Sequence, residues 1–145
     1  MKLTGLGKKG FTLGELLTVL IIVFLVAAAL SPLIRFNQLR MNRVNCARNI
    51  RETGRALYIY AVEHDGNFPE SIKDLYTEQY LAREELMDCP ATRHRGTADD
   101  PEYIYHPGLN VRDESLTPLL EDRSDNHRGG GQNTLLVNGA VTWRQ

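Results

Sequence analysis

Cysteine is scarce in this sequence, with two residues, Cys46 and Cys89, among 145. Two thiols exclude a disulfide-dense scaffold and any zinc site that needs four thiolates. The four histidines show no spacing typical of metal ligands, and no local pattern places a base beside either cysteine. The glycine run at 129–131 lacks the Lys-Ser/Thr pair of a phosphate-binding loop. We therefore expect a protein that is not an enzyme and needs no cofactor.

Net charge is also nearly absent, at −1, but the charges are unevenly distributed along the chain. Residues 1–10 carry three lysines, and residues 35–62 carry six arginines against one glutamate. Residues 63–145 carry eight basic residues against sixteen acidic ones. The average charge therefore describes no part of the molecule.

A long apolar run, by contrast, lies near the N-terminus. Residues 11–30 read FTLGELLTVLIIVFLVAAAL, with Glu15 as the only charged side chain. A helix of this length spans about 30 Å, the thickness of the hydrocarbon core of a bilayer. Ser31-Pro32 follows, and a proline there predicts a kink or a local break in hydrogen bonding. We therefore expect the transmembrane half of a longer helix, which leaves the bilayer near Pro32.

A basic leader, an apolar run and small residues also describe a cleavable secretory signal. On that alternative, the chain is a secreted binding or catalytic domain that is released after cleavage. Glu15 argues against it, because a carboxylate at membrane depth costs about 2.5–3.5 kcal/mol and is normally retained for a partner. The residues after Leu30 also continue as a helix instead of beginning a separate domain.

Residues 35–62 predict an amphipathic helix that continues the apolar one. Its apolar stripe recurs mostly at three- and four-residue intervals, at Phe36, Leu39, Cys46, Ile50, Leu57 and Ala61. Its basic stripe comprises Arg40, Arg48, Arg51 and Arg55. Gly54 is tolerable in this helix if another element packs closely against it. Cap and turn residues at 64–67 and the following Pro69 end the helix near Val62.

The rest of the sequence predicts short elements. Residues 70–86 predict one or two short helices, and residues 102–106 and 117–120 predict short strands. Asn138-Gly139 between two apolar, β-favouring runs predicts a hairpin. We therefore expect an α+β fold in which a long N-terminal helix packs against a small C-terminal antiparallel β-sheet.

The N-terminal motif resembles the prepilin cleavage and methylation signal of type IV pilins and type II secretion pseudopilins. In that family a short basic leader ends in Gly, followed by Phe-Thr-Leu, a Glu four residues after the Phe, and a hydrophobic run. KKG at residues 8–10 and FTLGELLTV at residues 11–19 match most of this pattern. Gly14 departs from it, because the family usually has a large aliphatic residue there. Pro32 falls where many such proteins have a helix-breaking proline.

A second, looser resemblance covers the soluble part of the chain. The run at residues 46–69, Cys89-Pro90 and the ending at residues 126–143 are similar to a broad group of pseudopilin-like proteins of environmental bacteria. Together the two resemblances cover most of the chain. They imply the pilin-like form of the α+β fold, with a membrane-spanning and an amphipathic half in one N-terminal helix.

The resemblance implies a specific processing event. A prepilin peptidase is expected to cleave between Gly10 and Phe11, and the new amine of Phe11 is expected to be N-methylated. Residues 1–10 are then a cytoplasmic leader, residues 11–32 the transmembrane half of the helix, and residues 33–145 a periplasmic pilin-like domain. The chain is thus expected to be a single-pass protein of the inner membrane, because the cleavage motif requires its leader in the cytoplasm.

Glu15 is expected to act in filament assembly. When such helices pack together, the amine of one subunit can meet Glu15 of its neighbour, which offsets the desolvation of both charges and fixes their register. The resemblance thus implies a structural subunit of a type II secretion pseudopilus or a type IV pilus-like filament. Its expected partners are other pseudopilins, the prepilin peptidase and the inner-membrane assembly platform. We expect the basic stripe to contact acidic surfaces of neighbouring subunits, and not nucleic acid.

Two further sites follow from the expected topology and the resemblance. Cys46 and Cys89 lie outside the cytoplasm, where disulfides persist, and a segment that folds back onto the helix brings them together; the alternative is two buried free thiols. Asp122, Asp125 and Asn126 form an acidic loop near the C-terminus. Some major pseudopilins bind calcium in such a loop, and oxygen ligands suit Ca²⁺, so calcium is an alternative to simple solvated acids.

Overall fold

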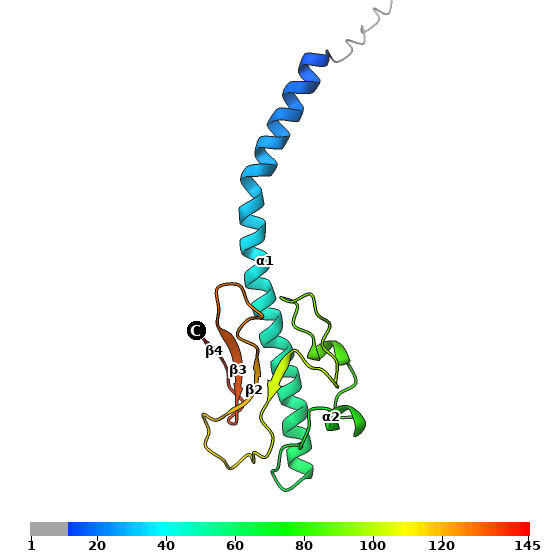
Figure 1. The fold of residues 1–145 in the computed structure, drawn as a ribbon, viewed down its shortest axis with the longest axis vertical. Helices are drawn as coiled ribbons and strands as arrows, with labels where there is room; N and C mark the ends of the chain where they lie inside the picture. The colour runs from blue at the N-terminus through cyan, green and yellow to red at the C-terminus, as the bar shows by residue number, and fades with distance from the viewer. Residues whose placement is uncertain (1–11) are drawn as a thin grey trace, which may run out of the picture. The chain divides into compact units, whose positions relative to one another are not determined.

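The computed structural model describes residues 12–145 and is shown in Figure 1. The chain forms two compact units, Met1–Asn37, of which residues 12–37 are described, and Gln38–Gln145. Helix α1 (Leu13–Glu63) is 51 residues long and contributes to both units. Gly10 and Phe11, the residues of the expected cleavage site, lie outside the described residues.

Short elements follow α1 in the second unit. They are α2 (Asp74–Thr77), the 3-10 helix η1 (Glu84–Met87), β1 (Tyr103–Tyr105), β2 (Pro118–Asp122), β3 (Gln132–Leu136) and β4 (Val141–Arg144). The strands form one antiparallel sheet in the order β1-β2-β3-β4. The α+β layout expected from the sequence is therefore confirmed in outline, as one long apolar N-terminal helix followed by a small four-stranded sheet.

The predicted C-terminal hairpin is formed by β3 and β4. Thr134 lies opposite Thr142 in its register. The Leu136 N–H donates to the Ala140 carbonyl at 2.9 Å across the turn. Gly139 occupies the turn with φ 82°, a left-handed conformation that glycine adopts without strain. A local turn signal therefore sets the position of the last two strands.

The core of the second unit lies between α1 and the sheet. Ile50 and Leu57 are fully buried on the predicted apolar stripe of α1. The stripe was predicted too long, because Phe36 and Leu39 are 58% and 42% exposed. The first fully buried residue of α1 is Cys46, and the first contact with the sheet lies one turn earlier, where Arg43 stacks on Trp143 of β4. A periodic pattern predicts a helix face but not how far along the helix a neighbour reaches.

At Gly54 the sheet comes close to α1. A Cβ atom at this position would lie 2.8 Å from Leu135 Cδ2 of β3. Such a distance is shorter than van der Waals contact, so the missing side chain makes room for the leucine. The expectation that another element packs closely against Gly54 is confirmed.

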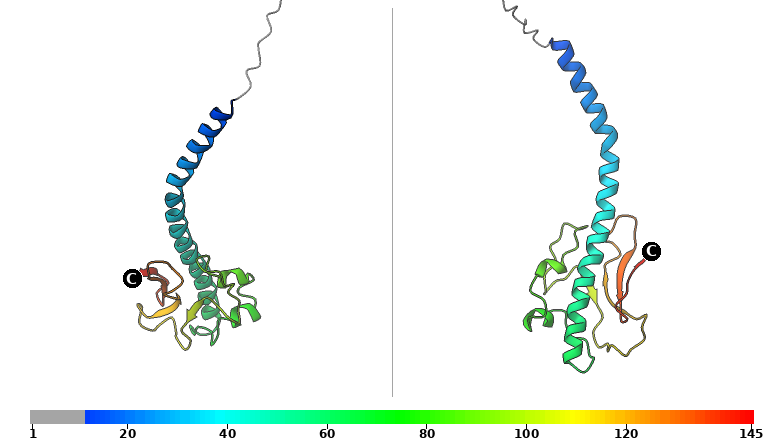
Figure 2. Two further views of the ribbon diagram at one scale, coloured as in Figure 1. Left: turned by 45° about the horizontal axis from the view of Figure 1, so that its top comes forward. Right: turned by 180° about the vertical axis from the view of Figure 1, so that it is seen from behind.

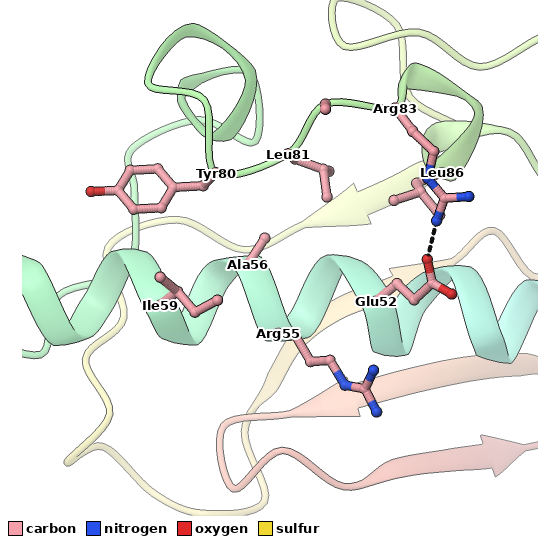
Figure 3. Close-up of a pocket in the computed structure, with 9 residues that line it drawn as sticks. Glu52, Arg55, Ala56, Ile59, Tyr80, Leu81, Arg83 and Leu86 are labelled. Atoms are coloured by element: carbon pink, nitrogen blue, oxygen red, sulfur yellow. Dashed lines mark hydrogen bonds and ion pairs between the residues drawn. The ribbon is translucent and has the colours of Figure 1, made fainter.

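A second layer, formed by residues 64–102, packs on the other side of α1. Figure 2 shows the sheet on one side of the second part of α1 and the segment with α2 and η1 on the other. Figure 3 shows where this segment passes along the helix, with Leu81 near Ala56 and Leu86 beside Arg83, in a groove of about 300 Å³. Arg83 closes one end of this contact by pairing with Glu52 of α1.

Candidate functional site

Reciprocal hydrogen bonds between Thr12 and Glu15 close the start of α1. The N–H and the hydroxyl of Thr12 both donate to Glu15 Oε2, at 2.8 and 2.9 Å. The Glu15 N–H lies 3.3 Å from Thr12 Oγ1, which accepts its hydrogen bond. This arrangement is a capping box, which satisfies backbone donors that have no partner at a helix N-terminus. The Glu15 carboxylate, which is expected to act in assembly, therefore accepts hydrogen bonds from Thr12 of its own chain in the isolated subunit.

The part of α1 that follows this cap is uncovered. Every residue from Leu13 to Asn37 is exposed, including Phe24, whose exposed fraction is 73%. This segment is long and apolar enough to cross a membrane, by its length and composition. Because monomeric soluble proteins rarely expose apolar surfaces of this extent, the segment needs an apolar environment that the described residues do not provide.

Pro32 lies within this uncovered segment and does not end the helix. Proline has no N–H, so the carbonyl four residues earlier, that of Ala28, loses its normal donor. The Ser31 hydroxyl donates to this carbonyl at 3.0 Å and replaces the missing hydrogen bond. The predicted break in hydrogen bonding thus affects the one backbone donor that Pro32 lacks, and the Ser31 hydroxyl replaces that donor.

The basic stripe lies on the exposed face of α1 in the second unit. Arg48, Arg51 and Arg55 are exposed, and Arg48 Nε lies 3.3 Å from Glu52 Oε1 one turn further on. Apolar residues recur at helical spacing on the same face, and Val62 at its end is 83% exposed. Arginine mixed with apolar side chains is typical of protein–protein interfaces.

Asp122, one of the two acidic residues considered for calcium, is fully buried at the end of β2. Its Oδ1 accepts the backbone N–H of Asn133 at 2.7 Å, and its Oδ2 accepts the side-chain amide of Asn133 at 2.8 Å. Oδ2 also lies 2.9 Å from Nε2 of His127. Asp125, in contrast, is exposed. Both oxygens of Asp122 therefore bind groups of the chain, and the structure does not join the two aspartates in one site.

Cys46 of α1 and Cys89, two residues after η1, form a disulfide with their Cα atoms 5.5 Å apart. Both residues are fully buried. The bond closes a loop over a sequence separation of 43 residues, which is worth about 4 kcal/mol on the chain-entropy model. The structure thus pairs the two cysteines that the sequence analysis paired.

His127 lies beside this disulfide. One ring nitrogen and the sulfurs of Cys46 and Cys89 all lie within 4.8 Å of one another. The ring also packs edge-on against Trp143, with centroids 5.5 Å apart. The Tyr103 hydroxyl lies 3.5 Å from Cys46 Sγ and donates to the Asp88 carbonyl at 3.1 Å. Burial raises the pKa of Tyr103 well above its ordinary value, so this hydroxyl stays protonated.

Three of these features were missed in the sequence. The Thr-x-x-Glu spacing of Thr12 and Glu15 is a known signature of a helix start, so the capping box could have been predicted from the sequence. The serine directly before Pro32 could likewise have predicted a side-chain hydrogen bond that replaces the missing backbone donor. The cluster around His127 gave no signal, because its members are far apart in sequence and only the fold brings them together.

Comparisons with known proteins add no relative of this chain. No protein-family model matches it, and neither a curated protein nor a solved structure does so. What supports a function is therefore the motif at residues 8–19 together with the uncovered helix that follows it.

Proposed function

We propose that this chain is a structural subunit of a pilus-like filament, of the type II secretion pseudopilus or type IV pilus kind, and not an enzyme. The observation that carries the proposal is the coincidence of a prepilin-like motif at residues 8–19 with an apolar helical segment that no described residue covers. The membrane before assembly, and the packed helices of other subunits after it, supply the apolar surroundings that this segment needs.

Processing prepares the helix for assembly. Prepilin peptidase removes residues 1–10 on the cytoplasmic side, and the new amine of Phe11 is methylated. The mature chain then begins with a positive charge directly before Thr12. The carboxylate of Glu15 exchanges its local hydrogen bonds from Thr12 for the amine of a neighbouring subunit, because pairing opposite charges offsets their desolvation in an apolar bundle.

The second unit lies in the periplasm. A disulfide between Cys46 and Cys89 suits this oxidising compartment. The exposed face with Arg48, Arg51 and Arg55 meets acidic surfaces of neighbouring subunits. Residues 63–145 of each subunit supply these surfaces, because they carry most of the acidic residues of the chain. Other pseudopilins and the inner-membrane assembly platform are the partners.

The secreted-domain alternative places cleavage near Ser31, within α1. At this position Ser31 replaces the donor that Pro32 lacks, so that the helix continues. This hydrogen bond stabilises the helix across the site where a signal peptide would be cut. It benefits a helix that stays intact and packs along its whole length, and not a signal peptide that is removed. This contact therefore favours the filament subunit over the secreted domain.

The N-terminal peptide of the mature chain tests the proposal. The full chain is co-expressed with a prepilin peptidase, recovered from membranes and analysed by mass spectrometry. The proposal predicts a peptide that begins at Phe11 and carries one methyl group on its amine. Gly10→Val is expected to retain the leader, while the matched variant Gly7→Val is processed as the wild type. A mature chain that begins near Ser31 would overturn the proposal.

A further inference from the structure

The face of α1 that points away from the core is uncovered in the second unit. Its residues recur every three or four positions, and we call them the outer stripe: Val44, Arg48, Arg51, Arg55, Ile59 and Val62. The three apolar members are 60%, 54% and 83% exposed. The buried residues Ile50 and Leu57 lie on the opposite side of the helix. Apolar side chains mixed with arginine on an exposed face are typical of a surface that binds another protein.

Two arginines of the outer stripe have no acidic partner within the described part of the chain. One carboxylate oxygen of Glu52 lies 3.3 Å from Arg48 Nε, and the other pairs with Arg83. Arg51 and Arg55 form no ion pair with any described residue. Figure 3 shows the guanidinium of Arg55 directed away from the Glu52–Arg83 pair. The outer stripe therefore presents positive charge to a partner outside the chain.

The opposite charge lies at the end of the same helix. Four exposed carboxylates gather there, and we call them the acidic end: Glu63, Asp65, Glu70 and Glu78. Three of them line a polar hollow of about 450 Å³. Burial raises the pKa of Tyr60 in this hollow, and nearby carboxylates, that of Glu78 first, raise it further. The only lysine between residues 63 and 80, Lys73, pairs with Asp99. The acidic end therefore presents negative charge.

We propose that the outer stripe binds the acidic end of a second copy of this chain, with the two α1 helices running in the same direction. Arg55 and Glu63 are eight residues apart, which is about 12 Å along a helix. Parallel copies displaced by about this distance place the carboxylates of one beside the arginines of the next. The contact is heterologous, because it joins two different surfaces, and such a contact repeated along an axis builds an open filament.

The apolar part of the contact comes from the same offset. Val62, the most exposed of the three apolar residues of the outer stripe, stands next to Glu63 of the acidic end. At a displacement of about 12 Å, Val62 of one copy lies level with Arg55 of the other. The aliphatic stem of an arginine can cover an apolar side chain while its charged head reaches a carboxylate. The charged and the apolar contacts therefore form together.

This inference rests on the filament proposal, which supplies the parallel neighbouring copies. It adds the two surfaces by which the second units recognise each other and the offset between them. Both surfaces lie in the second unit, so the pairing can be measured apart from N-terminal processing.

An exchange of charges tests the inference. Two full-length chains with different affinity tags are co-expressed with a prepilin peptidase and extracted in detergent micelles at low ionic strength. Recovery of one chain through the tag of the other measures pairing. The double variant Arg51→Glu/Arg55→Glu, the stripe variant, has two acidic surfaces. The double variant Asp65→Lys/Glu70→Lys, the end variant, has two basic surfaces.

Each variant alone is expected to lower the recovery by about tenfold or more, because like charges across an interface cost several kcal/mol. The two variants expressed together are expected to restore it, because every contact between them joins opposite charges. Restoration also shows that both variants are folded. Salt at 1 M, where the Debye length is about 3 Å, is expected to lower the recovery of the wild type.

The matched control is Arg93→Glu/Arg95→Glu, which changes the net charge as the stripe variant does but on exposed residues after η1. It is expected to pair as the wild type does. No co-recovery of the wild type, wild-type recovery from the stripe variant alone or from the end variant alone, an equal loss in the control, or no restoration in the mixture would each overturn the inference. Loss in the stripe variant alone would assign its partner to another acidic surface or to nucleic acid.

Mass spectrometry of the same samples reads the N-terminus of the mature chain. A failed exchange of charges with a mature chain that begins at Phe11 overturns this inference and leaves the filament proposal standing. A mature chain that begins near Ser31 overturns the filament proposal, whatever the recovery.

Discussion

The first part of α1 is the more apolar but is exposed, whereas the second part is the more charged but contains the buried residues. Residues 13–37 contain most of the large aliphatic side chains of the helix, and all of them are exposed. Residues 38–63 carry five arginines and still provide the buried stripe from Cys46 to Ala61. The sheet and the segment with α2 and η1 cover the second part, and no described residue covers the first. A helix is buried by what packs against it, and apolar composition alone does not supply that partner.

The energetic consequence differs between the two parts. Apolar surface gains about 25 cal/mol per Å² when it leaves water, so the first part gains this free energy only from lipid or from other helices. The second part gains it within its own unit. Substitutions in the first part should therefore affect membrane insertion and assembly, whereas substitutions in the second part should affect the stability of the folded unit.

The disulfide gives the largest expected effect on the second part. Reduction and alkylation in metal-free buffer should lower the free energy of unfolding of this unit by about 4 kcal/mol. Chemical denaturation of the full chain in micelles, followed by near-ultraviolet circular dichroism, measures this loss. Peptide mapping without reductant should recover Cys46 and Cys89 in one linked peptide. Two alkylatable thiols in oxidised protein would contradict the pairing.

A matched pair of leucines separates the two parts of the helix most simply. Leu57→Ala removes a fully buried side chain and should cost about 3 kcal/mol in the same denaturation experiment. Leu25→Ala removes a side chain that is 60% exposed and should change stability by less than about 0.5 kcal/mol. Equal losses in the two variants would show that the first part also packs within the folded unit.

Two glycines of α1 provide a second matched pair with a smaller effect. Gly54→Leu forces a side chain against Leu135 and should destabilise the second unit by about 2 kcal/mol. Gly14→Leu meets nothing within 4 Å and should leave the denaturation midpoint unchanged. A neutral Gly54→Leu would mean that β3 can move away from α1 at little cost.

The smallest effect is expected at Ser31. Ser31→Ala removes the hydrogen bond to the Ala28 carbonyl and should cost about 1 kcal/mol of local helix stability. Hydrogen exchange of the amides near residue 32 should accelerate in micelles. The same substitution made together with Pro32→Ala should have no such effect, because an alanine at 32 restores the backbone donor. If Ser31→Ala accelerates exchange equally with Pro32 and with Pro32→Ala, the Ser31 hydroxyl does not compensate for the donor that Pro32 lacks.

Local signals predicted the local structure well. The period of the apolar residues predicted α1, and Asn138-Gly139 predicted the hairpin, because both depend on residues that are close in sequence. The pairing of Cys46 with Cys89 was accessible because two cysteines allow a single pair.

Features that depend on long-range packing were less accessible. The sequence did not reveal that full burial on α1 begins at Cys46, since the sheet and the segment with α2 and η1 that cover the helix follow it in the chain. It also placed Asp122 in a solvated acidic loop, whereas the structure buries this residue with His127 and Asn133. Periodicity and turn signals carry no information about which distant residues meet.

We propose that the first part of α1 packs against other subunits of the filament and that the charge of Glu15 is needed for this assembly. Filament yield in the sheared fraction of Glu15→Gln, with the membrane level of the protein as control, tests it most directly. Glutamine keeps an oxygen that can accept hydrogen bonds from Thr12, so it retains a cap and removes only the charge. Thr12→Val, which removes the hydroxyl from the cap and keeps the charge, serves as the matched variant. We predict that Glu15→Gln and Glu15→Ala both lower filament yield by roughly a hundredfold, because breaking a buried ion pair costs about 3–5 kcal/mol. Wild-type yield from Glu15→Gln would show that the charge is not needed for assembly and that Glu15 serves only as a helix cap.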